Sequence, residues 1–181
     1  MSMKKAKLMD LVGFYLNAKM KHNEFERFRQ REIELIVYDF DGVMTNNKVT
    51  VNELGHESVM VNRSDGLAIS ELKRMGIPQI ILSTEKNEVV QQRAKKLGIP
   101  CFNGVRNKKY VLEDYIHKNN ISKANVAYLG NDINDLECMR LVGFPIAPSD
   151  ADWKIKKIAK FITKAKGGDG VIRELMNMIG T

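Results

Sequence analysis

Short apolar runs rich in branched residues recur along the chain, and segments with a helix-like spacing of apolar residues lie between them. The apolar runs are 33–38, Gln79–Ser83, Asn125–Leu129, Phe144–Ala147 and the stretch near Phe161–Thr163. The segments with helical spacing are Leu67–Met75, Glu88–Leu97, Lys109–Lys118 and Asp135–Val142. Strands that alternate with helices in this way predict an α/β fold, a Rossmann-like parallel sheet with helices on both faces.

The pattern changes between the first strand and the first helix. Valines alternate with polar residues on both sides of the turn-forming stretch 52–56. This alternation predicts a β-hairpin, residues 46–62, inserted in place of a cap domain. No segment of the chain is long enough to form a separate cap over a site near the sheet.

Residues 1–31 have the pattern of a charged, amphipathic helix, and we expect them to form a helical leader before a domain that covers residues 32–181. Lysines followed by apolar residues resemble the start of a signal peptide. Asp10 interrupts that apolar run, however, and no convincing cleavage site follows it. No apolar stretch is long enough to span a bilayer.

Composition and charge narrow the class of partner. The chain has 181 residues and a net charge of +7, with lysines spread over several predicted helices. No aromatic and arginine stacking motif accompanies them, so we expect a small anionic substrate rather than a nucleic acid or a membrane. Cys101 and Cys138 lie far apart without metal-like spacing, which favours a reducing cytoplasm.

The strongest candidate chemistry follows the first strand. Asp39 and Asp41 are two residues apart, so a strand points both side chains to one side, and Gly42 lets the chain turn away. The carboxyl end of such a strand is where open α/β sheets bind ligands. Two carboxylates there can bind Mg²⁺, or one can attack phosphorus while the other moves protons. The alternative is that both residues only form a turn.

Three further polar segments follow in sequence, namely Ser83 at a strand end, Lys108 at a helix start, and Gly130–Asp135 after another strand. Together with residues 39–45, these segments resemble the four motifs of the haloacid dehalogenase superfamily of phosphatases. Taken singly, each has a structural alternative, such as a solvated lysine or an ordinary helix N-terminus.

The resemblance implies a role for each motif residue. Asp39 matches the nucleophile that forms an aspartyl-phosphate, and Asp41 matches the acid and base whose backbone carbonyl also binds the metal. Ser83 would bind a phosphoryl oxygen, and Lys108 would neutralise the phosphoryl group. The implied cofactor is Mg²⁺, and the implied activity is that of a phosphoric monoester hydrolase.

The fourth motif departs from the usual family pattern at one position. Most members have an acidic metal ligand directly after the glycine, and this chain has Asn131. An amide oxygen still ligates Mg²⁺ but brings no charge. We expect Asp132 and Asp135 to compensate, either directly or through water.

The chain resembles one branch of the family, which has small caps. This branch includes 3-deoxy-octulosonate 8-phosphate phosphatases, ketodeoxynononate 9-phosphate phosphatases and the C-terminal domain of some acylneuraminate cytidylyltransferases. The resemblance implies a substrate from sialic acid metabolism or a related sugar acid pathway. The residues that carry it are Arg63–Gly66, Ser83–Asn87 and Gly167–Glu174.

The residues after Ser83 favour a nine-carbon substrate. Octulosonate enzymes typically have Gly-Arg where this chain has Thr84 and Glu85, whereas the nononate and acylneuraminate relatives have Glu-Lys, as at Glu85 and Lys86 here. Glu85 would accept hydrogen bonds from sugar hydroxyls, and Lys86 would pair with the substrate carboxylate. A solvated helix start is the alternative.

The resemblance also implies a homotetramer in which hairpins meet and the C-terminal tail reaches a neighbouring site. Arg63 and Arg173 would then bind the substrate. The glycine-rich segment 167–170 fits a flexible tail or an anion-binding turn. The alternative for this tail is a loop followed by a surface helix. Two function classes remain open, a Mg²⁺-dependent sugar-acid phosphatase and a non-catalytic oligomerisation module associated with a cytidylyltransferase.

Overall fold

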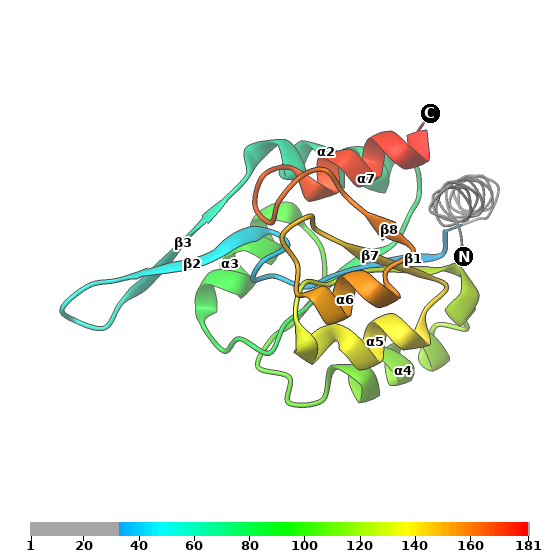
Figure 1. The fold of residues 1–181 in the computed structure, drawn as a ribbon, viewed down its shortest axis with the longest axis horizontal. Helices are drawn as coiled ribbons and strands as arrows, with labels where there is room; N and C mark the ends of the chain where they lie inside the picture. The colour runs from blue at the N-terminus through cyan, green and yellow to red at the C-terminus, as the bar shows by residue number, and fades with distance from the viewer. Residues whose placement is uncertain (1–32, 181) are drawn as a thin grey trace, which may run out of the picture. The chain divides into compact units, whose positions relative to one another are not determined.

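The computed structural model describes residues 33–180 and contains a six-stranded, parallel sheet (Figure 1). The strands, in their order across the sheet, are β5 Cys101–Phe102, β4 Gln79–Leu82, β1 Leu35–Tyr38, β6 Val126–Leu129, β7 Phe144–Ala147 and β8 Phe161–Ile162. The order reverses at β1, which pairs with β4 on one side and β6 on the other. The expected α/β fold with a Rossmann-like parallel sheet is confirmed.

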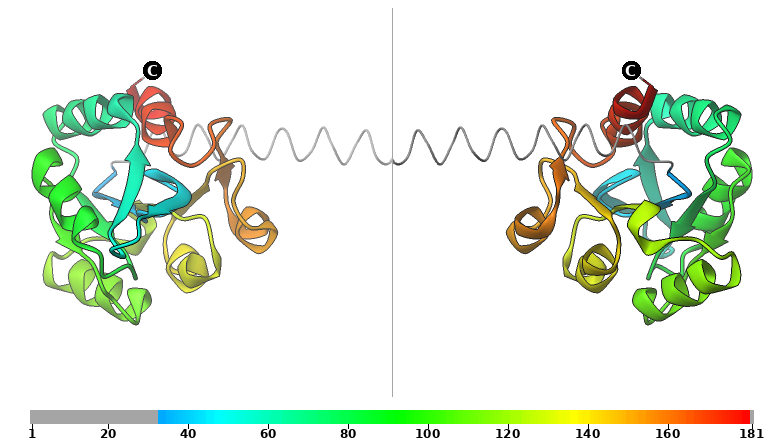
Figure 2. Two further views of the ribbon diagram at one scale, coloured as in Figure 1. Left: turned by 90° about the vertical axis from the view of Figure 1, so that its left-hand side faces the viewer. Right: turned by 90° about the vertical axis from the view of Figure 1, so that its right-hand side faces the viewer.

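Helices cover both faces of this sheet (Figures 1 and 2). The helices on one face are α2 Arg63–Arg74, α3 Glu88–Leu97 and α7 Val171–Gly180. Those on the other face are α4 Lys108–Lys118, α5 Leu136–Leu141 and α6 Trp153–Ile158, and the 3₁₀ turns are Lys123–Asn125 and Ile133–Asp135. All four residues of β1 are buried, as expected for a central strand covered on both faces.

Asparagines fix where several helices begin. The side chains of Asn62, Asn87 and Asn107 accept backbone N–H bonds at the starts of α2, α3 and α4. The cap at Asn62 starts α2 at Arg63, earlier than the apolar spacing predicts. The cap at Asn107 makes Lys108 the first residue of α4. The start of this helix holds the Lys108 side chain at the edge of the sheet.

The predicted hairpin follows β1 directly. Strands β2 Thr45–Val51 and β3 Glu57–Val61 pair antiparallel, with a shift of register between Thr45 and Val49. The hairpin extends outward from the carboxyl edge of the sheet (Figure 1), and several of its apolar side chains are exposed.

The expected helical leader at 1–31 lies outside the described residues. Within residues 33–180, no helix is both long and apolar enough to cross a membrane.

Candidate active site

A cavity of about 320 Å³ opens at the carboxyl ends of β1, β4 and β6. These strands are adjacent in the sheet, so residues far apart in the sequence meet at one edge. The cavity is lined by Asp39, Asp41, Asn47, Ser83, Thr84, Asn131, Asp132 and Asn134.

Asp39 lies at the base of this cavity and is 3% exposed. Its Oδ1 atom lies 2.7 Å from Lys108 Nζ and accepts a second hydrogen bond of 2.7 Å from the Phe40 backbone N–H. Burial raises the pKa of Asp39 well above its ordinary value, the charge of Asp135 raises it further, and Lys108 opposes both effects. The lysine therefore helps the buried carboxylate to keep its charge.

Asp135 is buried behind Lys108 and orients it. Asp135 Oδ1 lies 2.8 Å from Lys108 Nζ and accepts a hydrogen bond of 2.7 Å from the Tyr128 hydroxyl. Its Oδ2 atom accepts the backbone N–H groups of Asn131 and Asp132 at 3.0 and 3.4 Å. Both carboxylate oxygens are thus engaged within the chain, and Asp135 connects the turn after β6 to the lysine.

Lys108 is shared between two carboxylates and is 3% exposed. Burial lowers the pKa of this lysine, but the charges of Asp39 and Asp135 and their hydrogen bonds raise it by more, so that its pKa lies above the ordinary value. Lys108 is therefore cationic at neutral pH and balances part of the negative charge in the site.

Asp41 lies at the mouth of the cavity and is partly exposed. Its Oδ1 atom accepts a hydrogen bond of 3.2 Å from Thr45 Oγ1. Burial raises the pKa of Asp41, the Thr45 hydroxyl lowers it, and the charges of Glu85 and Glu57 raise it. A raised pKa suits a carboxyl group that exchanges a proton during catalysis.

Ser83 directly follows β4, and its side chain is buried, 2% exposed. Its backbone N–H donates to Phe102 O at 2.8 Å, and its Oγ accepts the Glu85 N–H at 3.1 Å. The hydroxyl hydrogen remains available for an acceptor in the cavity. On the same wall, the Thr84 hydroxyl oxygen accepts a hydrogen bond of 3.4 Å from Asn134 Nδ2.

Asn131 supplies a buried oxygen without a partner. The residue is 7% exposed, and its Oδ1 atom accepts no hydrogen bond from the described residues. A buried amide oxygen in this position costs free energy unless a ligand pairs with it, and an oxygen ligand suits a hard divalent cation. The residues present therefore fit such an ion, with Asp39, the backbone oxygen of Asp41 and Asn131 as its candidate ligands.

The cation would depend on amide and backbone oxygens as well as carboxylates. Within residues 33–180, no three His, Cys, Asp or Glu side chains converge on one point as a metal cluster would require. This agrees with the sequence, since Asn131 stands at the position where the resemblance implies an acidic metal ligand.

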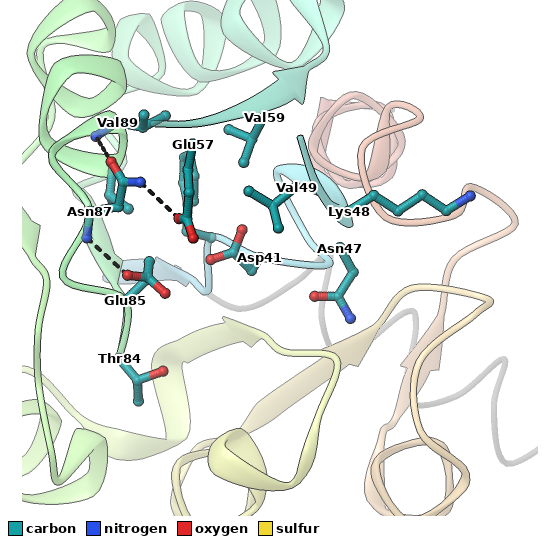
Figure 3. A pocket seen from close by; sticks show the side chains of 12 residues that line it. Asp41, Asn47, Lys48, Val49, Glu57, Val59, Thr84, Glu85, Asn87 and Val89 are labelled. Atoms are coloured by element: carbon teal, nitrogen blue, oxygen red, sulfur yellow. Dashed lines mark hydrogen bonds between the residues drawn. The ribbon is translucent and has the colours of Figure 1, made fainter. Parts of the chain in front are cut away.

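A second cavity of about 310 Å³ adjoins the first and shares Asp41, Asn47 and Thr84 with it. Figure 3 shows that it lies between the hairpin and the start of α3. Asn87 Nδ2 donates a hydrogen bond of 3.0 Å to Glu57 Oε2 on the hairpin, and Asn87 N–H donates to Glu85 Oε1, also at 3.0 Å (Figure 3). The remaining lining residues include Phe40, Lys48, Val49, Val59, Val89 and Val90.

Residues 14–175 match the family model of the haloacid dehalogenase-like hydrolases. The chain belongs to this family. It is 30% identical over 152 residues to the 3-deoxy-D-manno-octulosonate 8-phosphate phosphatase of Escherichia coli K12, covering 83% of this chain and 81% of that enzyme. The match to curated phosphatases supports a phosphoric monoester hydrolase, which confirms the class of enzyme expected from the sequence.

Solved structures of the hydrolase family have the same fold. The octulosonate 8-phosphate phosphatase of Moraxella catarrhalis, solved with magnesium, phosphate and the sugar acid KDO, has a TM-score of 0.82 and 29% identity, covering 87% of this chain and 90% of that one. A hydrolase of the family from Streptomyces avermitilis has a TM-score of 0.80 and 42% identity, covering 81% of this chain and 84% of that one. A related enzyme from Haemophilus influenzae was solved with cobalt, so divalent metals accompany this fold.

Three residues that the sequence assigned to substrate binding line neither of the two cavities in this hydrolase. Lys86 packs near Gly104, and Arg63 lines a separate cavity beside Gly168. Arg173 Nη2 donates a hydrogen bond of 3.2 Å to Ser64 O. The substrate-binding roles of these three residues stay predictions, because the structure of a single chain does not test them.

Sequence reasoning missed five polar residues that line the cavities, namely Asn47, Lys48, Glu57, Asn87 and Asn134. Asn134 lies within the fourth motif, and Asn87 directly follows the Glu85 and Lys86 pair, so proximity to a motif was an available signal. Glu57 had no such signal, since it comes from the far strand of the hairpin.

Proposed function

We propose that the chain is a Mg²⁺-dependent phosphatase that hydrolyses a 2-keto-3-deoxy sugar acid phosphate through an aspartyl-phosphate on Asp39. The observation that carries this proposal is the buried ion pair between Asp39 and Lys108 at the base of an open cavity, with Asp41 at its mouth. A charged carboxylate held in a fixed position beside a cation is suited to attack a phosphoryl group.

In the first step, an oxygen of Asp39 forms a bond to phosphorus while the bond from phosphorus to the sugar oxygen breaks. Asp41 gives its proton to the departing sugar oxygen, which leaves as an alcohol. The Ser83 hydroxyl and the Lys108 ammonium interact with the phosphoryl oxygens and hold the group in line for attack.

In the second step, Asp41 is a carboxylate and takes a proton from a water molecule as that water attacks phosphorus. The bond between phosphorus and Asp39 breaks, inorganic phosphate leaves, and Asp39 returns to its carboxylate form. Asp41 ends protonated, as it began, so atoms and protons balance over the cycle. Its raised pKa supports this alternation.

Mg²⁺ is the cofactor of this proposal. The candidate ligands are Asp39, the backbone oxygen of Asp41 and the unpartnered Asn131 Oδ1, with Asp132 able to act directly or through water. When bound, the ion would offset the negative charge of the phosphoryl group. Asp135 was also a candidate ligand, and we now assign it the task of holding Lys108, because both of its oxygens are already engaged.

The proposed substrate is a nine-carbon keto acid 9-phosphate, whose sugar portion would occupy the second cavity. Two carboxylates, Glu57 and Glu85, border this cavity and suit the hydroxyl groups of a sugar chain. The curated relative named above acts, by its name, on an eight-carbon 8-phosphate. The proposed enzyme would therefore differ from it in the number of carbon atoms of its sugar acid substrate.

We further propose a homotetramer in the cytoplasm. The exposed apolar residues of the hairpin, which include Val51, Leu54 and Met60, support association through this element. A non-catalytic oligomerisation module is the weaker alternative, because such a module would not need Lys108 to be buried between Asp39 and Asp135.

A panel of sugar phosphates assayed with Mg²⁺ and with a chelator tests the proposal. We expect turnover only with the metal, and a kcat/KM for the nine-carbon substrate about tenfold to a hundredfold above that for the eight-carbon one, from roughly 1–3 kcal/mol of matched polar contact. Glu85→Arg should narrow or reverse this preference. Equal values in the wild type would reduce the proposal to a general sugar phosphatase, and no turnover would favour the oligomerisation module.

A further inference from the structure

The glycine-rich segment 167–170 packs directly against the loop that follows Asp41. Gly168 N–H donates a hydrogen bond of 3.0 Å to Val43 O. A β-carbon on Gly167 would lie 2.7 Å from the carbonyl carbon of Gly42 and 3.0 Å from Thr45 O. Real β-carbons do not approach backbone atoms so closely, so a residue other than glycine at 167 would push this loop away.

The adjoining glycine is equally constrained. Gly168 has a φ of +74°, and a β-carbon there would lie 2.6 Å from Asn46 N. On its other side, the same loop contacts the fourth motif, because a β-carbon on Gly42 would lie 2.5 Å from Asn131 Cγ. The loop 42–46 is therefore held between the glycine pair and the Asn131 side chain.

The glycine pair is itself anchored to the body of the domain. Gly167 N–H donates a hydrogen bond of 2.9 Å to Asp150 Oδ1. Upstream, the backbone N–H of Ala165 donates to Glu174, and at the start of α7 the Arg173 N–H donates to Asp65 Oδ1. The segment thus has fixed points on both sides, as a rigid support requires.

We propose that Gly167 and Gly168 are positioning residues, which hold the loop 42–46 against Asn131 and so fix the spacing between the Asp41 backbone oxygen and the Asn131 amide oxygen. This inference rests on the proposed metal site. It also bears on the two roles that the sequence suggested for this segment, a flexible tail or an anion-binding turn. The N–H groups of both glycines already have acceptors, Asp150 and Val43, so neither is available to an anion.

Gly167→Ala and Gly168→Ala test the inference, each against a matched control. Gly55 has a φ of +77° and nothing within 4 Å of its β-carbon position, so Gly55→Ala reproduces the backbone strain of Gly168→Ala without the contact. Gly180→Ala is the control for Gly167, since nothing lies within 4 Å there either. If a glycine variant has a larger effect than its matched control, the difference comes from the contact between the added methyl group and the loop 42–46.

The main measurement is the dissociation constant of Mg²⁺ alone, determined by calorimetry. We expect both loop variants to bind Mg²⁺ about tenfold more weakly, the cost that is typical when a support of a metal ligand is lost, and both controls to bind it normally. Turnover should fall mainly through kcat, because the loop directly follows Asp41 and the substrate cavity keeps its walls.

Nuclear magnetic resonance of the metal-free protein supplies an independent measurement. The Gly42 amide and the Asn131 side-chain amide signals should shift in Gly167→Ala and stay in place in Gly180→Ala. If the wild type itself binds no Mg²⁺, the proposed metal role fails, and these shifts still decide whether the glycines position the loop.

Asp150→Ala covers the case in which the glycine variants do not fold. This change removes the acceptor of the Gly167 N–H without adding a clash, and Asp114→Ala on the exposed face of α4 is its control. We expect weaker Mg²⁺ binding and a shifted Gly42 signal in Asp150→Ala. Unmoved signals together with Mg²⁺ affinities within about twofold of the wild type in the folded variants would overturn the inference.

Discussion

The side chain of Asn131 occupies the space into which a β-carbon on Gly42 would project. Gly42 has a φ of +81°, so the turn after Asp41 requires glycine for its conformation as well as for this contact. The sequence suggested only the first reason. The second links the first motif to the fourth, and it explains how an uncharged amide is held close to Asp39 and Asp41.

Gly42→Ala should therefore abolish most activity. The added methyl group meets Asn131 and also strains a backbone with positive φ, so the amide oxygen moves away from Asp39 and Asp41. We expect kcat to fall by about a hundredfold, the size of effect that a displacement of about 1 Å produces. Steady-state kinetics check this, with Gly76→Ala as the control, because its φ of +80° is the same and nothing lies within 4 Å. Comparable losses in both variants would contradict the contact as the cause.

Lys108→Met should destabilise the protein as well as inactivate it. It leaves Asp39 and Asp135 buried without their shared cation, and removing one partner from a buried ion pair costs about 3–5 kcal/mol. Burial already raises the pKa of Asp39, and without the lysine this pKa would lie still further above that of the unfolded chain. Protonation at low pH then relieves the penalty, so the loss of stability should be greatest at neutral pH and smaller in acid.

Thermal unfolding at neutral pH and near pH 5 measures this difference. Lys118→Met is the control, because Lys118 forms an exposed pair with Asp114. A destabilisation of Lys108→Met that does not change with pH would mean that lost packing, rather than unpaired charge, is its cause.

Asn131→Asp should tighten Mg²⁺ binding by adding a ligand charge to the set. In the metal-free protein, the same change places another carboxylate near Asp39, so the apo form should unfold at a lower temperature. Calorimetric titration and unfolding curves with and without Mg²⁺ measure the two effects. Unchanged or weaker affinity would show that Asn131 does not contact the metal.

Glu57→Gln should lower the pKa of Asp41, because the negative charge of Glu57 is one of the groups that raise it. Asp41 must carry a proton when the sugar oxygen leaves, and activity is lost as the pH rises through its pKa. The alkaline limb of the kcat/KM profile should therefore move to lower pH in this variant. The pH profile of Glu53→Gln, in the hairpin turn outside both cavities, is the control and should match the wild type.

The sequence was sufficient to predict five of the six strands of the sheet and the position of three polar residues beside them, because each rests on local pattern. Asp39, Asp41 and Ser83 follow apolar runs, and strand ends in a parallel sheet meet at one edge. Strand β5 and helix α6 were not predicted, because segments of two and six residues are too short to show a periodic spacing of apolar residues. Helix α7 was only one of two interpretations of the tail.

The partners of Asp135 could not be predicted, because they depend on contacts between distant parts of the sequence. Its position in the fourth motif suggested a metal ligand. Its actual neighbours, Lys108 and Tyr128, come from α4 and β6, and only the folded chain brings them together. The glycines at 167 and 168 were open to two interpretations for the same reason, since their contact with residues 42–46 crosses most of the chain.

The most direct test of the account is phosphate release by Asp39→Asn, because the proposed chemistry begins with this carboxylate. The amide has nearly the same volume but is a poor nucleophile. We predict that the purified variant releases phosphate from the best substrate only at the background rate, while its circular dichroism spectrum matches that of the wild type. Retained turnover in a correctly folded Asp39→Asn protein would contradict the aspartyl-phosphate mechanism.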